Sequence, residues 1–181
     1  MERNITLIAL FAALIAALGL VPKFDLAGGV PITAQSLGVM LAGTILGARR
    51  GALAVLLFLF LVALGLPLLA GGRGGLGVFQ GPTAGFIVGF PLAALVTGWA
   101  SRAWAGRGAT GVLGTALAAL LGGVVVLYVF GIAGFALVTD RSFGAAAAIM
   151  WVFVPGDVIK AVLAGFITQG VLRARPDLAR G

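Results

Sequence analysis

Residues 67–90 read PLLAGGRGGLGVFQGPTAGFIVGF and interrupt a chain that is otherwise built from long apolar runs. The first part of this stretch, which we call the glycine-rich loop (residues 67–83), carries one cation, Arg73, and two neutral polar side chains, Gln80 and Thr83. A loop of this length is either functional or disordered. Its leucine, valine and phenylalanine residues make it too apolar for a flexible linker. We therefore interpret it as an ordered loop folded over a binding cavity.

The composition outside this loop is typical of a polytopic membrane protein. Of the 181 residues, 61% are hydrophobic and 9% are charged, and the mean hydropathy is +1.20, whereas soluble domains carry about 25% charged residues. The apolar runs are continuous rather than alternating, which favours helices over a β-barrel. The absence of cysteine and histidine excludes disulfides, Cys/His metal sites and histidine acid–base chemistry. We expect no bound metal, and we interpret the net charge of +7 as a sign of membrane topology rather than of a nucleic acid partner.

The apolar runs predict an all-α integral membrane protein with six transmembrane helices in a single domain, residues 1–181; seven helices are the alternative. The basic turn Arg49-Arg50-Gly51 is expected to separate the second and third helices. The last run, Phe143–Leu172, is long for one span, so Pro155-Gly156 is expected to divide it into a short interfacial piece and the sixth helix. The predicted helices cover about residues 5–21, 34–48, 51–66, 83–101, 111–138 and 155–172.

The distribution of charge predicts that both termini are cytoplasmic. With six spans, the termini and two of the turns lie on one side and hold eight of the twelve Lys and Arg residues. The opposite loops hold only Lys23, Arg73 and Arg141, and Lys160 lies within a predicted span. Because basic residues accumulate on the cytoplasmic side, the glycine-rich loop is expected outside, in a multi-pass protein of the cell (inner) membrane.

Small residues recur at four-residue spacing, which places them on one helical face and permits close helix–helix approach. For the two glycine sets we predict packing inside the bundle. For the alanine set, composition alone favours the simpler explanation that alanine is abundant. The sets are Gly43, Gly47 and Gly51; Gly81, Gly85 and Gly89; and Ala9, Ala13 and Ala17.

Asp157 is the only one of the five acidic residues placed inside an apolar run, and Lys160 follows three residues later. This spacing places both side chains on the same face of a helix. Ionised groups at membrane depth are costly, so they usually line a cavity, form a pair or meet a ligand. We predict a ligand site here, with a structural ion pair as the alternative. If the sixth helix begins near Pro155, Asp157 lies in its first turn, where the helix dipole favours a carboxylate.

Other polar and aromatic side chains complete the predicted pocket. It would offer cations for a carboxylate, an anion for N–H donors, and apolar walls. The predicted pocket residues, besides Asp157 and Lys160, are Gln35, Arg73, Gln80, Thr83 and Tyr128, with Phe24, Phe79, Phe86 and Phe153 as walls.

The sequence contains no convincing nucleotide-binding motif. Residues 72–77, GRGGLG, satisfy the dinucleotide pattern G-x-G-x-x-G, but no strand precedes them and no βαβ unit surrounds them. No Walker A sequence is present, and neither Lys23 nor Lys160 lies in a P-loop. Any ATP-driven work would therefore require a partner protein.

Residues 31–90, PITAQSLGVMLAGTILGARRGALAVLLFLFLVALGLPLLAGGRGGLGVFQGPTAGFIVGF, closely resemble the BioY family. Later matches are Tyr128-x-x-Gly131 and Gly156-Asp157-x-x-Lys160, so the resemblance covers about residues 30–165. BioY proteins are the biotin-specific substrate-binding subunits (S-components) of energy-coupling factor (ECF) transporters. The resemblance implies an S-component-like bundle in the lipid bilayer that binds biotin near its outer face. It also implies a transmembrane coupling protein and two cytoplasmic ATPase subunits as partners, with ATP used only by those partners and no cofactor in this chain.

The resemblance also implies roles for individual residues. S-components commonly use an A-x-x-x-A face of the first helix to dock the coupling protein, which matches Ala9/Ala13 or Ala13/Ala17. The ureido N–H groups of biotin suit Asp157, and its valerate suits Lys160 or Arg73. The alternatives are an S-component for another small vitamin and, from a different class, an intramembrane enzyme. No nucleophile–base arrangement is recognisable, so we expect no enzymatic activity.

Overall fold

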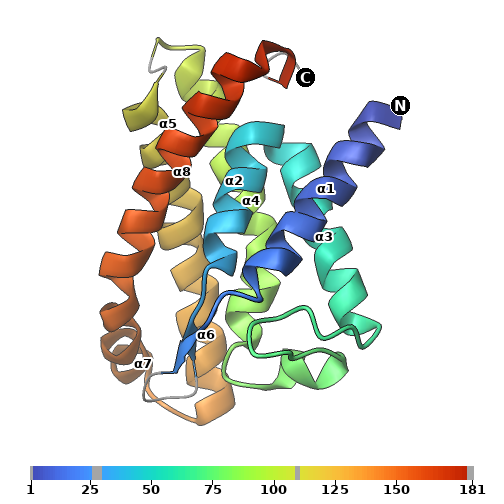
Figure 1. Cartoon of the computed structure of the whole chain (residues 1–181). Helices are drawn as coiled ribbons and strands as arrows, with labels where there is room; N and C mark the ends of the chain where they lie inside the picture. The colour runs from blue at the N-terminus through green and yellow to red at the C-terminus, as the bar shows by residue number, and fades with distance from the viewer. Residues whose placement is uncertain (1, 26–29, 109–110, 179–181) are drawn as a thin grey trace.

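The computed structural model describes residues 2–25, 30–108 and 111–178, which form a helical bundle with both termini at the same end (Figure 1). The first half contributes α1 (Glu2–Leu18), α2 (Gln35–Leu46), α3 (Ala48–Ala63) and α4 (Ala84–Ala105). The second half contributes α5 (Val112–Leu120), the π-helical turn η2 (Leu121–Val126), α6 (Leu127–Thr139), α7 (Phe143–Met150), the 3-10 turn η3 (Trp151–Phe153) and α8 (Val154–Ala174). The short elements are β1 (Phe24–Asp25), which pairs antiparallel with β2 (Pro31–Ile32), and the 3-10 helices η1 (Leu76–Gln80) and η4 (Pro176–Leu178).

These elements confirm the predicted all-α membrane fold. α5, η2 and α6 follow one another without a break, as do α7, η3 and α8, so the described residues form six helical segments. Three segments are long and apolar enough to cross a membrane: Ala84–Ala105, Val112–Thr139 and Phe143–Ala174. The others are shorter, because α1, α2 and α3 contain 17, 12 and 16 residues.

α2 is the central helix of the bundle. Of its residues only Leu37 is not buried, and the helix contacts α1, α3, α4 and α8 (Figure 1). A 12-residue helix is about 18 Å long at 1.5 Å per residue, too short to cross the hydrocarbon core by itself. Its burial explains how a short helix is stable here: its neighbours, rather than lipid, surround it. Its first turn delivers polar side chains to the middle of the bundle.

The break between the second and third helices lies at Gly47, so the predicted boundary at Arg49-Arg50-Gly51 is wrong. Gly47 has φ +82°, a left-handed conformation that glycine adopts without strain. Arg49 and Arg50 belong to the first turn of α3 instead. Gly51 lies within α3 and packs against the backbone of Ala42 in α2. Glycines four residues apart both satisfy a turn pattern, and only the backbone conformation distinguishes them.

The last apolar run changes helix type at Trp151–Phe153, before the predicted division at Pro155-Gly156, which lies inside α8. α7 ends at Met150, the 3-10 turn η3 follows, and α8 begins at Val154 with Pro155 in its first turn. Proline is tolerated there because the first N–H groups of a helix have no intrahelical partner. Asp157 consequently lies in the first turn of α8.

The small-residue sets have different surroundings. A Cβ atom on Gly43 would overlap the Ala94 carbonyl of α4, and one on Gly85 would overlap the backbone of α6, which confirms close internal packing at these positions. Gly81 has open space around it. The alanine set does not pack inside the bundle: Phe11, Ala12 and Ile15 form the buried face of α1, whereas the alanines at positions 9, 13 and 17 are exposed.

Candidate ligand-binding site

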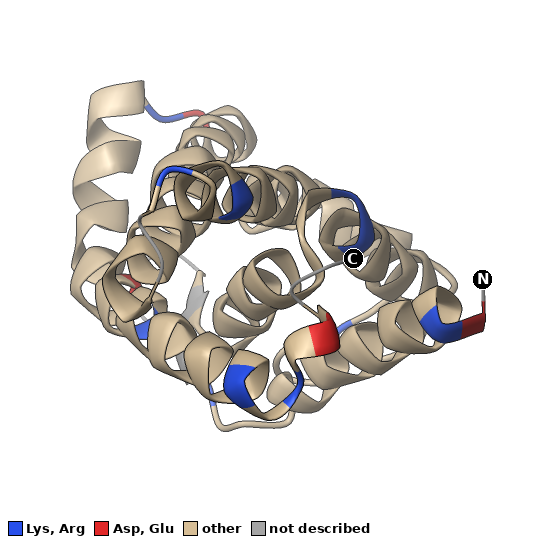
Figure 2. Ribbon diagram, turned by 90° about the horizontal axis from the view of Figure 1, so that it is seen from above, with Lys and Arg blue, Asp and Glu red and all other residues tan. Residues whose placement is uncertain are grey.

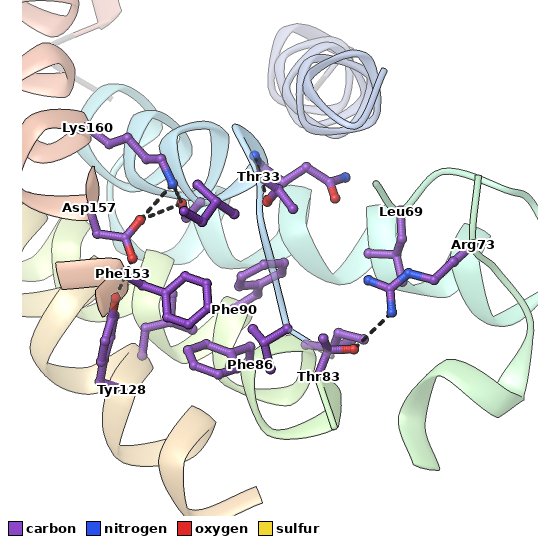
Figure 3. A pocket seen from close by; sticks show the side chains of 16 residues that line it. Thr33, Leu69, Arg73, Thr83, Phe86, Phe90, Tyr128, Phe153, Asp157 and Lys160 are labelled. Atoms are coloured by element: carbon purple, nitrogen blue, oxygen red, sulfur yellow. Dashed lines mark hydrogen bonds and ion pairs between the residues drawn. The ribbon is translucent and has the colours of Figure 1, made fainter. Parts of the chain in front are cut away.

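A cavity lies beneath the glycine-rich loop and is lined by side chains from β2, α2, the loop, α4, α6, η3 and α8 (Figure 3). Its volume is about 640 Å³, counting the part that is open to solvent. Small-molecule sites typically combine apolar walls with a few convergent polar groups. The polar side chains in this cavity form two separate groups.

The first group, which we call the Asp157 group, consists of Ser36, Tyr128, Asp157 and Lys160. The Lys160 ammonium donates to Asp157 Oδ1 at 2.8 Å and to Ser36 Oγ at 3.0 Å. Ser36 Oγ donates to the same Asp157 oxygen at 3.1 Å, and the Tyr128 hydroxyl donates to Asp157 Oδ2 at 2.7 Å. Asp157 and Lys160 therefore lie on one face of the helix, as their spacing predicted, and they form the ion pair that was the alternative to a ligand site.

Burial explains why so many donors meet at one carboxylate. Asp157 is 8% exposed, and a buried charge is stable only when it is paired and hydrogen-bonded. Lys160 supplies the opposite charge. Asp157 itself lies in the first turn of α8, where the helix dipole favours an anion. The lysine ammonium has three N–H donors, and the two bonds described above leave one for a ligand.

The second group, which we call the Arg73 group, consists of Arg73 and Thr83. The Arg73 guanidinium donates from Nε to the Ala70 carbonyl and from Nη1 to Thr83 Oγ1, both at 3.2 Å. In residues 2–25, 30–108 and 111–178, no carboxylate with a described side chain forms an ion pair with Arg73. A guanidinium has five N–H donors in a planar fork that matches a carboxylate. Arg73 is thus a half-buried cation whose guanidinium keeps N–H donors that these two bonds do not use.

Aromatic rings lie between the two polar groups. Phe86 and Phe90 of α4 and Phe153 of η3 line the cavity, and the close view places them between Asp157 and Arg73 (Figure 3). The Phe86 and Tyr128 rings meet edge to face, with centroids 5.8 Å apart and an interplanar angle of 86°. This is a preferred aromatic geometry, and it fixes the orientation of both rings. The cavity thus suits a ligand with an apolar middle and two polar ends.

Gln35, a predicted site residue, borders the cavity but uses its amide to hold the backbone. Its Nε2 donates to the carbonyls of Ile15 at 3.2 Å and Leu68 at 3.0 Å, and its Oε1 accepts from the Ala70 N–H at 2.9 Å. It is 2% exposed. Gln35 therefore ties α1 and the glycine-rich loop to α2, and so positions the loop that carries Arg73.

Other predicted wall and polar residues lie elsewhere. Gln80 is exposed, and Phe79 packs against the main hydrophobic core, so neither lines this cavity. The side chain of Phe24 lies outside the described part of the structure. Sequence reasoning missed Ser36 and Phe90. Ser36 could have been found from its position beside Gln35, since two adjacent polar residues opening a buried helix need partners.

Comparison with known proteins places the chain in a family. The model of the BioY family matches residues 2–177. The chain belongs to the BioY family. It is 54% identical over 192 aligned residues to the biotin transporter BioY of Rhodobacter capsulatus, with 100% of both chains covered. It is 53% identical over 180 residues to the biotin transporter BioY of Rhizobium etli, with 97% of this chain and 96% of that protein covered.

A solved structure supports the same assignment at the level of the fold. The S-component for biotin from an ECF-type ABC transporter superposes with a TM-score of 0.89 at 29% identity, covering 95% of this chain and 92% of that one. This likeness confirms the predicted S-component-like bundle. Members of this family are membrane transport proteins, so the alternative of an intramembrane enzyme is set aside.

Proposed function

We propose that this chain is a biotin-binding S-component, a single membrane domain in the cell (inner) membrane that captures biotin and works with an ATP-driven coupling module. The observation that carries the proposal is the cavity with two polar groups separated by phenylalanine rings. Biotin has the same division: a ureido ring at one end, a carboxylate at the other, and an apolar thioether ring and aliphatic chain between them. Full-length relatives named biotin transporters support this ligand over another small vitamin.

Charge suggests which end of biotin meets which group. The positive charge of Lys160 is already compensated by Asp157 at 2.8 Å. Among the described residues Arg73 donates only to a carbonyl and a hydroxyl, so a ligand carboxylate would supply a countercharge. We therefore assign the valerate to Arg73 and the ureido ring to the Asp157 group. There Asp157 would accept from a ureido N–H, and the remaining N–H of Lys160 would donate to the ureido oxygen.

Purification in detergent followed by mass spectrometry tests the ligand directly. We expect biotin to be released from the denatured protein in close to stoichiometric amount, and radiolabelled biotin to exchange into the site. Excess thiamine or riboflavin should not displace it, because neither vitamin carries a carboxylate for Arg73. Displacement by another vitamin, or its presence in place of biotin, would contradict the assignment.

The exposed alanine face of α1 suggests how the chain meets its coupling protein. The alanines at positions 9, 13 and 17 form an outward stripe of small residues, and helix association within lipid depends on such close packing. The chain has no Walker A sequence, so ATP-driven uptake requires partners. We propose that this stripe contacts a transmembrane coupling protein, itself bound to two cytoplasmic ATPase subunits.

Ala13→Trp tests that contact. We expect it to abolish ATP-driven uptake and co-purification with the coupling protein while biotin binding by the isolated subunit is unchanged, since position 13 lies outside the cavity. Ala148→Trp is the matched control, because Ala148 is an exposed alanine of α7. Co-purification of Ala13→Trp at wild-type yield would contradict the proposed interface.

The orientation of the bundle follows from its basic residues, which we propose face the cytoplasm together with both termini. Single cysteines test this cleanly because the native chain has none. Gly77→Cys and Gly106→Cys are suitable, since an added Cβ has open space at Gly77 and only ordinary contacts at Gly106. A membrane-impermeant maleimide should label position 77 in intact cells and position 106 only after permeabilisation. The reverse pattern would refute the orientation.

A further inference from the structure

A second cavity lies at the end of the bundle that carries both termini, and four arginines line it: Arg3, Arg49, Arg50 and Arg102. We call it the arginine cavity. It has a volume of about 670 Å³ including its opening, and Asn4, Leu46 and Ala48 complete its lining. In the view onto this end, Lys and Arg residues are distributed over several helices around the bundle (Figure 2).

Among the described residues, only one carboxylate forms an ion pair with an arginine of this cavity. Arg3 approaches Asp177 at 3.6 Å, and that carboxylate also binds Arg175 at 3.1 Å. The hydrogen bond from Arg175 holds the pKa of Asp177 below its usual range, so the carboxylate is ionised but shared. Within the described ranges, Arg49, Arg50 and Arg102 form no ion pair. Four cations around one cavity repel each other, and an anion inside it would relieve that repulsion.

The backbone adds to this positive potential. α3 begins at Ala48, on the wall of the cavity, with no side-chain cap and no acidic residue in its first turn. The first N–H groups of a helix lack intrahelical partners, and the helix dipole makes this end positive. Arg50 Nη2 is also buried without a hydrogen-bond partner among the described residues. A bound oxyanion would satisfy such donors.

The guanidinium groups are held in place rather than free in solvent. Arg50 Nε and Arg102 Nη2 both donate to the Leu46 carbonyl at 3.1 Å, and Arg50 Nη1 donates to Asn4 Oδ1 at 3.2 Å. Arg102 also lies directly over Gly47, where a Cβ atom would overlap its guanidinium. These bonds leave further donors on each fork, as recognition of a phosphate requires.

The position of the cavity points to lipid. Trp99 lies one turn before Arg102 on α4 and is 60% exposed, and tryptophan collects at the membrane–water interface. α1 and α3 pack against each other, and both begin at this end of the bundle (Figure 1). α3 exposes large apolar side chains, namely Leu53, Leu56 and Phe60. A phosphate in the cavity could therefore remain attached to acyl chains that lie along α3.

We propose that the arginine cavity binds the phosphate headgroup of an anionic phospholipid, with its acyl chains against α3. Basic pockets between transmembrane helices suit such headgroups, because the cations meet the phosphate at the level of the interface. This site is separate from the cavity beneath the glycine-rich loop, with which it shares no lining residue.

Native mass spectrometry and thermal unfolding in detergent with added dioleoyl phosphatidylglycerol test the proposal. The wild-type protein should retain phosphatidylglycerol in preference to dioleoyl phosphatidylcholine, and phosphatidylglycerol should raise its Tm more. Arg3→Gln/Arg49→Gln should weaken phosphatidylglycerol binding about tenfold or more, since charge-assisted bonds to phosphate are lost. Neither substitution removes a bond to Leu46. The matched control is Arg107→Gln/Arg173→Gln, which removes the same charge from residues outside the cavity and should bind as wild type.

Several outcomes would overturn the proposal. Equal retention of the two lipids, or equal loss of phosphatidylglycerol in both double variants, would mean that total charge rather than the cavity governs binding. Inorganic phosphate that raises the Tm as much as the lipid would identify a free anion as the ligand. Wild-type lipid binding by Arg3→Gln/Arg49→Gln, combined with loss of the coupling protein, would make the cavity a protein contact. Wild-type biotin binding in both variants is expected, and it establishes that they are folded.

Discussion

The Asp157 group and the Arg73 group face the same cavity but are held by different kinds of structure. The first joins side chains of α2, α6 and α8, and every contact within it links two side chains. In the second, Arg73 stands on the glycine-rich loop and bonds to a carbonyl of that loop and to Thr83 just before α4. The Asp157 group is therefore positioned by the packing of three helices, and the Arg73 group by the packing of one loop.

This difference suggests a division of labour in ligand binding. A network that is buried and mutually satisfied keeps its geometry when the site is empty, which lowers the cost of ordering on binding. A cation on a loop can approach or leave the cavity with that loop. The Asp157 group would then select the ureido ring, and the Arg73 group would close over the carboxylate. Substitutions in the two groups should have effects of different size and kind.

Asp157→Asn should have the largest effect. It retains the shape of the side chain but removes the charge, so Lys160 remains a half-buried cation without its partner. Removing one member of a buried charged network costs several kcal/mol, and we expect biotin affinity to fall by about two orders of magnitude or more. Equilibrium binding of radiolabelled biotin to purified protein measures this.

Lys160→Ala is the companion variant and should weaken binding to a similar extent, because it leaves Asp157 without its countercharge. Both variants should elute as monodisperse protein in size-exclusion chromatography, which separates loss of binding from loss of folding. Affinity within threefold of wild type in both would remove the Asp157 group from the proposed site.

Most residues of the Asp157 group were predicted from the sequence, whereas the arrangement of the Arg73 group was predicted only in part. The rarity of charge in an apolar run, together with helical spacing, identified Asp157 and Lys160. Ser36 is neutral, so the rarity of charge did not identify it, and its partner lies 121 residues away; only its position beside Gln35 indicated it. The glycine-rich loop has no helical or strand periodicity from which the direction of a side chain could be predicted. The sequence therefore could not show that Thr83 lines the cavity and that Gln80 does not.

The same limit applies to the fold. The long apolar runs predicted six helical segments, because runs of this length and apolarity are expected to lie in a membrane rather than in water. The break at Gly47 was misplaced because Gly47 and Gly51 are equally plausible turn residues, and the left-handed conformation of Gly47 depends on how α3 packs against α2. That α2 is central, although it is short, could not be read from its sequence.

Arg73→Gln should have an intermediate effect that depends on the ligand. We expect about a tenfold loss of affinity for biotin, at the lower end for a charge-assisted interaction because Arg73 is only half-buried. Biotin amide, which has no carboxylate, should bind Arg73→Gln and wild type alike. Competition binding with both ligands measures the difference. An equal loss for the two ligands would mean that Arg73 supports the loop rather than the carboxylate, and would leave Lys160 as the partner of the valerate.

The smallest effects should come from removing one neutral hydrogen-bond partner from each group. Tyr128→Phe deletes the hydroxyl that donates to Asp157 Oδ2 but retains the ring that meets Phe86 edge to face. Thr83→Val deletes the hydroxyl that accepts from Arg73 with little change of volume. Each charged group keeps its other hydrogen bonds, so we expect about a fivefold loss of biotin affinity in each variant, less than the full value of a charge-assisted bond.

These two variants should lose a similar amount of affinity but differ in the rate constant that changes. Tyr128→Phe acts on a network held by helices, so it should raise the dissociation rate of biotin and leave the association rate unchanged, as most interface substitutions do. Thr83→Val releases one of the two bonds that hold Arg73, so the loop would have to be ordered anew at each binding event and association should slow. Stopped-flow or surface-based binding of biotin separates the two rates. If both variants changed only the dissociation rate, the loop would be as well ordered as the helices, and the two groups would act as one rigid site.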